Sequence, residues 1–268
     1  MQIRNKKFDF EKHIYIWGIL NVTPDSFSDG GEAFGAVDAL DKAKKLIENG
    51  ADVLDIGGES TRPGFTPVPV DDEIGRVVPV IETIRRFSDI PISVDTRKSA
   101  VAMAAVKAGA DIINDVSGLR FDKSMAGVIA ESKAFCCLMH DGQYFDMKEN
   151  YIEGVKSDLS NIANDALRAG IDKSRIILDP GIGFGKNAGE NLMIIRELKQ
   201  FNSLGYPILL GCSRKSVIGA VTGLKVNERL EGTLATTAMA VMSGIAFVRV
   251  HDVKENVRFV SMMETLCR

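Results

Sequence analysis

Short apolar runs separated by longer amphipathic stretches repeat along the whole chain. Runs of this kind, bounded by polar or turn-forming residues, are typical of buried β-strands. The pattern predicts eight strands, at residues 14–20, 52–57, 91–96, 111–116, 134–140, 175–180, 207–212 and 247–251.

The stretches between these runs have apolar residues spaced three and four apart, which is the pattern of a helix with one buried face. Several of them end at a glycine, a common helix C-cap. Clear examples are residues 36–49, 73–87, 99–109, 191–201 and 234–244.

The repeated order of strand and then helix indicates the fold class. Strands that are apolar on both faces belong to parallel sheets covered by helices, and eight successive units favour a closed barrel. We therefore predict an α/β protein, a single (β/α)8 TIM barrel with parallel strands and outer helices, over residues 1–268 without a domain boundary. A doubly wound open sheet is the alternative.

Composition excludes some partners. The formal net charge is -3 and lysine and arginine do not cluster, so we expect no nucleic-acid partner. No apolar run is long enough to span a membrane, and the charged N-terminus lacks the apolar core of a signal peptide. We expect a cytoplasmic protein with no membrane partner. Its cysteines form no CxxC pair and predict reduced thiols in the core; they are Cys136, Cys137, Cys212 and Cys267.

Polar residues stand at or near the end of each predicted strand. Barrels of this class place their active sites at the C-terminal ends of the strands, so these side chains would meet at one mouth. At any single position the start of a loop explains a polar residue, but the repetition indicates a site for a polar heteroaromatic ligand and an anion. The residues are Asn21, Asp55, Asp95, Asn114, Asp115, His140, Asp179, Arg249 and His251, with Ser213, Arg214, Lys215 and Ser216 after the seventh run.

Two long motifs carry a family resemblance. NVTPDSFSDGG at 21–31 and DIGGESTRPG at 55–64 resemble the two signatures of dihydropteroate synthases. The similarity continues, in order, through SVDTRK (93–98), IINDVSG (112–118), ILDPGIGFGK (177–186), GCSRKS (211–216) and RVHDV (249–253). One segment departs from the family pattern, MHDGQYFDMKENY at 139–151, and we expect this to change loop packing or substrate access but not the reaction class.

The resemblance implies an enzyme that joins a dihydropterin, supplied as its pyrophosphate, to 4-aminobenzoate and releases diphosphate. It also implies a homodimer formed through the C-terminal helices. The neutral arylamine is already a nucleophile, so the protein mainly has to position the partners and stabilise the departing charge. We favour, as a hypothesis, a route in which diphosphate leaves first.

The pterin suggests roles for the strand-end acids. A carboxylate can accept both neighbouring N–H donors of an amino-pyrimidinone edge, and Asp179 is our candidate for this pairing, with a turn-capping role as the structural alternative. The resemblance adds Asp95 and Asn114 at the ring nitrogens and Lys215 on the carbonyl side. We also count Met139 as a substrate-binding residue.

The anionic parts of the substrates need positive or N–H donors. The resemblance implies Mg²⁺ held by Asn21 and the diphosphate, with Arg249 and His251 on phosphate oxygens, which fits the few protein ligands that Mg²⁺ takes. For the carboxylate of 4-aminobenzoate we predict Ser216 with Thr61 and Arg62.

Further predictions concern the second substrate and the loops. We expect the 4-aminobenzoate ring to lie between Phe184 and Pro63. The segments 26–32 and 60–69 are rich in Gly, Ser and Pro, and we predict that they act as lids, with Asp25 and Arg62 assisting turnover alongside Lys215, Arg249 and His251.

Other readings of single motifs are weaker. GIGFGK at 181–186 lacks the last glycine and the acidic partner of a dinucleotide-binding fingerprint. Lys215 stands in a polar loop and not alone in an apolar wall, which argues against a Schiff-base lysine. A pterin-dependent methyltransferase and a catalytically silent pterin-binding barrel remain as alternative functions.

Overall fold

The computed structural model describes residues 1–22, 31–59, 67–144 and 150–267, with side chains in the first helix described from residue 38 onward. Its main sheet has eight parallel strands whose order around the sheet follows the chain. A parallel bridge between Leu178 and Ile208 joins the two ends of the sheet and closes the ring. The strands are β3 (Tyr15–Asn21), β4 (Val53–Gly57), β5 (Ile92–Asp95), β6 (Ile112–Asp115), β7 (Phe135–Met139), β8 (Ile176–Asp179), β9 (Leu209–Leu210) and β10 (Phe247–Val250).

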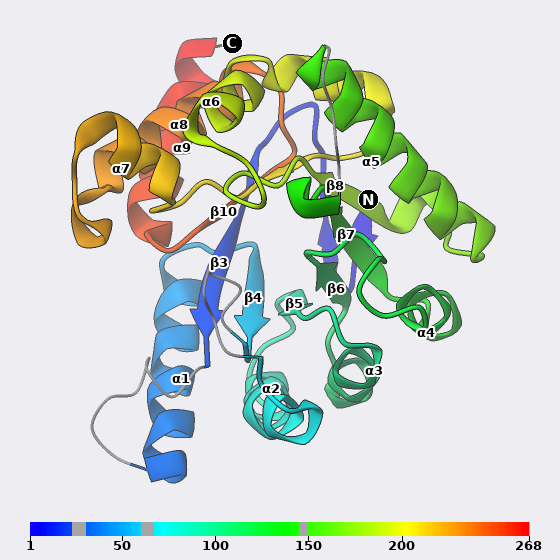
Figure 1. Cartoon of the computed structure of the whole chain (residues 1–268). Helices are drawn as coiled ribbons and strands as arrows, with labels where there is room; N and C mark the ends of the chain where they lie inside the picture. Colours follow the sequence, from blue (N-terminus) through cyan, green and yellow to red (C-terminus); the bar gives the residue numbers. More distant parts are fainter. Residues whose placement is uncertain (23–30, 60–66, 145–149, 268) are drawn as a thin grey trace.

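Helices follow the strands and surround the ring, as Figure 1 shows. The predicted (β/α)8 barrel is therefore confirmed. The helices are α1 (Gly31–Glu48), α2 (Val70–Arg85), α3 (Ser99–Ala108), α4 (Met125–Ser132), α5 (Tyr151–Arg168), α6 (Ala188–Arg196), α7 (Ser216–Thr222), α8 (Leu230–Met242) and α9 (Val253–Cys267). Helix α7 is an addition to the repeat, because it lies between β9 and the barrel helix α8.

Helix ends follow local chemistry more than the hydrophobic period. Helix α6 begins at a capping box, in which the Asn187 side chain accepts from the backbone N–H of Glu190 and the Glu190 carboxylate accepts from that of Asn187. Helix α3 ends at Gly109, whose φ of 116° is costly for other residues. The helix predicted over 191–201 ends at Arg196, and the chain continues as a 3-10 segment over Leu198–Leu204.

Alternation along the strands divides their side chains into two sets. Successive residues of a strand point to opposite faces of the sheet, so in a barrel one set faces the helices and the other faces the interior. The first set is apolar and forms the main core with the helices; it includes Ile16, Leu20, Leu54, Ile56, Ile92, Val94, Ile113, Cys136, Leu138, Leu178, Leu210, Val248 and Val250.

Inward-facing residues near the N-terminal ends of the strands form a second apolar cluster. It contains Trp17, Val53, Ile112, Cys137, Ile177, Leu209 and Phe247, with Ile3 and Phe8 from the N-terminal segment packed against them. This cluster fills the lower part of the barrel, so the space for a ligand lies at the other end of the strands.

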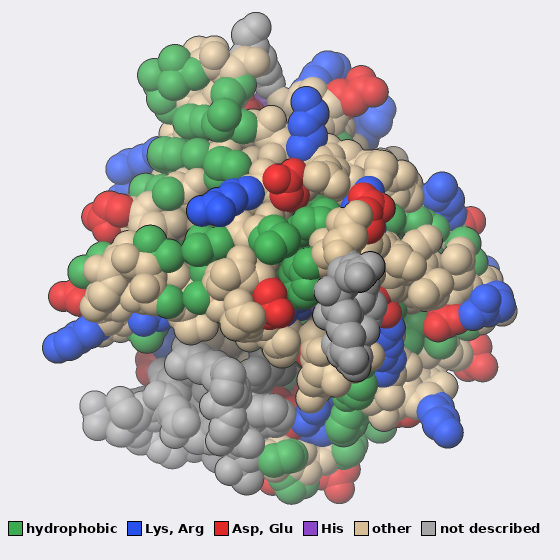
Figure 2. Space-filling view, turned by 45° about the horizontal axis from the view of Figure 1, so that its top comes forward, with side chains coloured by type: hydrophobic (Ala, Val, Ile, Leu, Met, Phe, Trp, Pro, Cys, Tyr) green, Lys and Arg blue, Asp and Glu red, His purple; other side chains and the backbone are tan. Residues whose placement is uncertain are grey.

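Exposed apolar side chains gather on the C-terminal helices. Figure 2 shows hydrophobic side chains grouped beside the C-terminal end of the chain. The most exposed belong to α7, α8 and α9; they are Val221 (62%), Met242 (64%), Met262 (58%) and Leu266 (67%). Large apolar side chains that are exposed on neighbouring helices are candidates for an interaction surface.

An N-terminal hairpin covers the bottom of the barrel and was not predicted from the sequence. Its strands β1 (Gln2–Ile3) and β2 (Lys6–Lys7) pair antiparallel, and the chain then places Phe8 edge-on against Phe247, with ring centroids 5.6 Å apart. Strands of two residues show no detectable period, which explains why the charged segment gave no signal.

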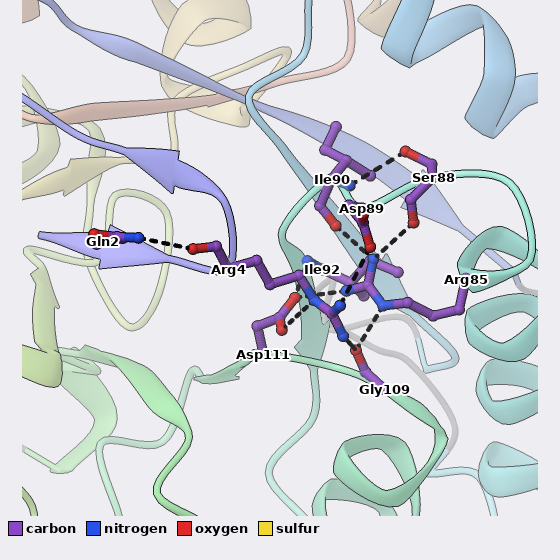
Figure 3. A network of polar contacts seen from close by, with 9 residues as sticks. All are labelled: Gln2, Arg4, Arg85, Ser88, Asp89, Ile90, Ile92, Gly109 and Asp111. Atoms are coloured by element: carbon purple, nitrogen blue, oxygen red, sulfur yellow. Dashed lines mark hydrogen bonds and ion pairs between the residues drawn. The ribbon is translucent and has the colours of Figure 1, made fainter.

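Ion pairs fix this hairpin to the loops below the strands (Figure 3). Arg4 donates to Asp111 at 2.7 Å and lies 3.6 Å from Asp89. Asp111 also accepts from Arg85 of α2 at 2.5 Å, and Arg85 donates in addition to the carbonyl oxygens of Gly109 and Ile90. The network joins the N-terminus, α2 and the segment between α3 and β6 at the end of the barrel away from the mouth.

Two sequence-based predictions can be checked here. Three of the four cysteines are buried and free, as expected, but Cys267 is exposed at the end of α9. Among the described residues, none of the helices is both long and apolar enough to cross a membrane.

Candidate active site

The mouth of the barrel is lined by the inward-facing residues that follow the apolar cluster. In six of the strands, a residue of the mouth follows two positions after a residue of the apolar cluster. These residues are Asp55 after Val53, Asn114 after Ile112, Met139 after Cys137, Asp179 after Ile177, Gly211 after Leu209 and Arg249 after Phe247. Asp95 joins this layer because it pairs in register with both Gly57 and Asn114. The same strands thus supply an apolar floor and a polar mouth.

Two strand-end acids surround Arg249. Its Nε donates to Asp55 Oδ2, and its Nη2 donates to Asp95 Oδ2 at 2.6 Å. Both carboxylates are buried, and each has a second oxygen, Oδ1, without a hydrogen bond within the described part of the chain. Asn114 approaches the same group, with its Nδ2 3.5 Å from Asp55 Oδ2. A partly buried arginine is therefore paired with two buried acids that retain acceptor capacity.

Burial and neighbouring charge act in opposite directions on Asp95. Loss of hydration raises the pKa of Asp95 to about 7, the charges of Asp55 and Glu73 add to the rise, and Arg249 and Lys215 oppose it. Burial alone would lower the pKa of Arg249, but the two acids outweigh it and raise this pKa, so Arg249 stays charged. A donor brought to Asp95 by a ligand would favour its ionised form.

The opposite side of the mouth is formed by Asp179 and Lys215. Asp179 Oδ1 accepts from the backbone N–H of Gly181 at 2.7 Å, so the turn-capping role considered for this residue is present. Its Oδ2 lies 3.6 Å from where a Cβ on Gly211 would stand, and Lys215 Nζ lies 3.9 Å from the same point. Gly211 therefore leaves space between a carboxylate and an ammonium group. Burial raises the pKa of Asp179 and lowers that of Lys215 to about 8.

The loop after β8 is held by a lysine whose role the sequence did not indicate. Lys186 Nζ donates to the carbonyl oxygens of His140, Gly181 and Phe184, at 3.1, 2.8 and 3.0 Å. Burial lowers the pKa of Lys186 to about 8. These bonds fix Phe184, whose ring centroid is 4.5 Å from Lys215 Nζ. The one sequence signal for this role of Lys186 was its position at the end of the glycine-rich GIGFGK motif.

A further group of polar residues lies where β9 and β10 end. Ser213 Oγ is 3.0 Å from His251 Nδ1 and accepts from the backbone N–H of His251 at 3.2 Å. Next to it Arg214 is paired with Asp252, with its Nε 3.0 Å from the Oδ2. Ser216 is exposed and begins α7.

Two of the expected strand-end residues do not belong to the mouth. Asp115 pairs in register with the outward-facing Leu138, and its carboxylate accepts from Ser117 and Leu119, so it caps the following turn. His140 is buried 3.8 Å from Asp158 of α5, and burial lowers the pKa of His140 to about 3, which keeps its ring neutral. Both follow an inward-facing residue, and the alternation of the strand turns them the other way.

The remaining predicted residues divide into two groups. Asn21 ends β3, and its Oδ1 lies 3.6 Å from where a Cβ on Gly57 would stand, so it borders the mouth beside Asp95. Met139 is buried and pairs in register with Asp179. The other predicted residues lie outside the described part of the chain; they are Asp25, Thr61, Arg62 and Pro63.

Comparison with known proteins agrees with this site. Residues 17–251 match the family of pterin binding enzymes. Fold and site together thus define a pterin-binding barrel enzyme.

Individual relatives show which family of pterin-binding enzymes the chain belongs to. The dihydropteroate synthase of Clostridium beijerinckii is 50% identical over 100% of both chains, and that of Bacillus subtilis is 48% identical over 96% of this chain and 90% of the other. The chain belongs to the dihydropteroate synthase family.

Solved structures show the same relationship in three dimensions. A dihydropteroate synthase of Clostridium difficile, crystallised in the presence of pteroic acid, superimposes with a TM-score of 0.94 at 47% identity, covering 98% of this chain and 100% of that one. A Xanthomonas albilineans dihydropteroate synthase with 4-aminobenzoic acid gives a TM-score of 0.90 at 41% identity, covering 95% and 93%.

The raised pKa of Asp95 predicts a pH-dependent contribution to stability. An unfolded aspartate ionises near pH 4, whereas folded Asp95 keeps its proton up to about pH 7, so its contribution to the unfolding free energy falls as pH rises between these values. In Asp95→Asn this titration is lost. The unfolding free energy of the wild type relative to the variant should therefore fall with a slope of at most about 1.4 kcal/mol per pH unit from pH 4 to 7, and then level off. Urea unfolding of both proteins across pH 4–8 measures the difference, and a constant difference would contradict the assignment.

Proposed function

We propose that this chain condenses 6-hydroxymethyl-7,8-dihydropterin pyrophosphate with 4-aminobenzoate to give 7,8-dihydropteroate and diphosphate. The observation that carries the proposal is the pair of buried carboxylates, Asp95 and Asp179, placed around the mouth of the barrel with Asn114 and Lys215. A pterin presents N–H donors on its ring edge and a carbonyl oxygen beside them, and these residues supply acceptors for the first and a donor for the second. Relatives of the same family have been crystallised with pteroic acid and with 4-aminobenzoic acid.

In this proposal Asp179 and Lys215 form hydrogen bonds with the pyrimidinone edge of the pterin. Asp179 uses Oδ1 for Gly181 N–H and has Oδ2 toward the space at Gly211, where a ligand donor would be bound. Lys215, next to that space, would donate to the carbonyl oxygen. Asp95 and Asn114 from the opposite strands would bind ring nitrogens. Charge-assisted bonds of this kind contribute about 1.5–3 kcal/mol each, so a ring without the donors would be rejected.

Three residues are assigned to the diphosphate: Arg249 and His251 would bind its oxygens, and Asn21 would hold its Mg²⁺. Ser213 Oγ accepts from the backbone N–H of His251 and lies 3.0 Å from its Nδ1. In the tautomer in which the Ser213 hydroxyl donates to Nδ1, the ring proton is on Nε2, a suitable donor to a phosphate oxygen. Arg249 is charged and uses Nε and Nη2 within the protein, so Nη1 is the nitrogen assigned to the anion.

Asn21 is the proposed protein ligand of Mg²⁺. Its amide oxygen borders the mouth where Gly57 leaves room. A single protein ligand agrees with the few protein ligands that Mg²⁺ takes when substrate phosphates supply the others. Bound there, Mg²⁺ would neutralise charge on the diphosphate.

The second substrate approaches the same mouth from the side of α7. Ser216 at the start of this helix is the described residue for its carboxylate, and Phe184, fixed by Lys186, offers a ring face. Thr61, Arg62 and Pro63 complete the proposed set, and Asp25 with Arg62 is proposed to assist turnover. Diphosphate departs first in this scheme, and the protein contributes by positioning the amine and by stabilising negative charge through Arg249 and His251.

We also propose a cytoplasmic homodimer. The exposed apolar residues of α7, α8 and α9 support the assembly, because hydrophobic surface of this extent is commonly covered by a second copy in oligomeric enzymes.

Synthase activity gives the direct test of the function. Product should form only when dihydropterin pyrophosphate, 4-aminobenzoate and Mg²⁺ are all present, with one diphosphate released per dihydropteroate. In Asp179→Asn the paired acceptor becomes partly a donor, and kcat/KM should fall by at least about 100-fold, in line with the loss of about 3 kcal/mol of charge-assisted bonding. Pterin binding without diphosphate release or product would contradict the synthase and point to a methyltransferase or a silent barrel.

Light scattering tests the dimer. The wild type should show twice the chain mass of 29.1 kDa. Met242→Glu with Leu266→Glu places charge on the proposed interface and should give the mass of one chain. A wild-type mass of 29.1 kDa at micromolar concentration would overturn the homodimer.

A further inference from the structure

A cluster of buried charge lies beside the mouth and takes no part in the site described above. It is centred on Lys98, which follows β5 and is buried together with Glu59 and Glu73. Glu59 follows β4, and Glu73 lies in the first turn of α2. Charges buried in this way need partners in good geometry to persist, so each contact in the cluster carries weight.

Lys98 uses its three donors on three separate segments. Its Nζ lies 2.7 Å from Glu59 Oε2, 2.5 Å from Glu73 Oε2 and 2.8 Å from the carbonyl oxygen of Val68. Glu59 Oε2 also accepts from the backbone N–H of Val68 at 2.7 Å. The peptide groups of Val68 are thus held on both sides, by the carboxylate of Glu59 and by the ammonium of Lys98.

Further contacts around this cluster hold the chain after β4 against the first turns of α2. Arg76 of α2 donates to the carbonyl oxygen of Gly58 at 2.8 Å. A Cβ on Gly58 would lie 2.8 Å from Val77 Cγ1 and 3.0 Å from Glu73 Cγ, so glycine allows the chain leaving β4 to lie directly on α2. Arg97 lies 3.4 Å from Glu59 Oε1 through its Nε.

We infer that Lys98, with Glu59 and Glu73, is a positioning residue that clamps together the two points where the chain leaves β4 and where it enters α2. Glu59 and Val68 stand on either side of residues 60–67, and the cluster fixes the position of both of them. The cluster thereby fixes the two ends of this connection, and it contains none of the residues assigned to a substrate. Its effect on catalysis rests on the proposed function, in which Thr61, Arg62 and Pro63 serve 4-aminobenzoate.

Lys98→Met tests the clamp, because methionine preserves the aliphatic chain and removes the donors. The first readout is hydrogen exchange at the Val68 amide, whose bond to Glu59 reports on the clamp without any turnover. We expect exchange there to speed up by at least about tenfold, since the local opening that exposes the amide becomes easier. The second readout is steady-state kinetics, where KM for 4-aminobenzoate should rise about tenfold while the dissociation constant of dihydropterin pyrophosphate changes less than about threefold.

Arg85→Met is the matched control. Arg85 is buried to a similar degree and also binds an acid and backbone carbonyl oxygens, but it belongs to the network at the other end of the barrel (Figure 3). It should lower the melting temperature while Val68 exchange and both substrate constants stay close to wild type. A general loss of stability would change the two variants alike.

A second variant keeps the test valid if Lys98→Met folds poorly. Lys98→Met leaves the carboxylates of Glu59 and Glu73 facing each other, and adding Glu73→Gln removes one of these charges. The double variant should recover the melting temperature. It should not recover the slow exchange of the Val68 amide or the KM for 4-aminobenzoate, because the donor to the Val68 carbonyl oxygen is still missing. Unchanged Val68 exchange in both Lys98 variants would overturn the clamp. Faster exchange with an unchanged KM would overturn its positioning role. A wild type that makes no dihydropteroate would refute the proposed function, while the exchange measurement would still decide on the clamp.

Discussion

Arg249 stands between the buried acids Asp55 and Asp95 at the mouth of the barrel, and the arrangement of the mouth depends on these three side chains. An arginine placed there needs compensating negative charge, and the positive charge of Arg249 opposes the rise that burial causes in the pKa of Asp95. Because the three side chains come from β10, β4 and β5, their attraction also fixes the relative positions of three strand ends. One oxygen of each acid is used in this way, and the other is left for ligands or ordered water.

The same physical arrangement separates stability from function along each strand. Outward-facing residues pack against helices, inward-facing residues near the start of the strands form an apolar floor, and inward-facing residues near their ends form the mouth. The N-terminal hairpin packs Ile3 and Phe8 against this floor. Glycines at 57 and 211 keep space among side chains that would otherwise fill the barrel. A polar ligand can therefore meet several buried acids and Lys215 without a change of fold.

Much of this could be predicted from the sequence because it follows from short periods and from strand ends. The apolar runs located all eight barrel strands, and the polar residue after each run located Asp95, Asn114 and Asp179. The same rule wrongly included Asp115 and His140, since it ignored that neighbouring residues in a strand face opposite ways. Lys186 and Lys98 could not be assigned roles, because their partners are backbone carbonyl oxygens or acids brought close only by the fold. The hairpin of β1 and β2 was too short to show a period.

Asp55 preorganises the pterin site by holding Arg249 and Asn114, although Asp55 itself is assigned no ligand contact. Calorimetric titration of Asp55→Asn with a dihydropterin tests this claim most directly, because the substitution keeps the shape of the side chain and removes its charge. We expect an affinity at least about tenfold lower than that of the wild type, equivalent to about 1.4 kcal/mol, in a protein that remains folded. An unchanged affinity would contradict the claim and show that the pterin site forms without this buried pair.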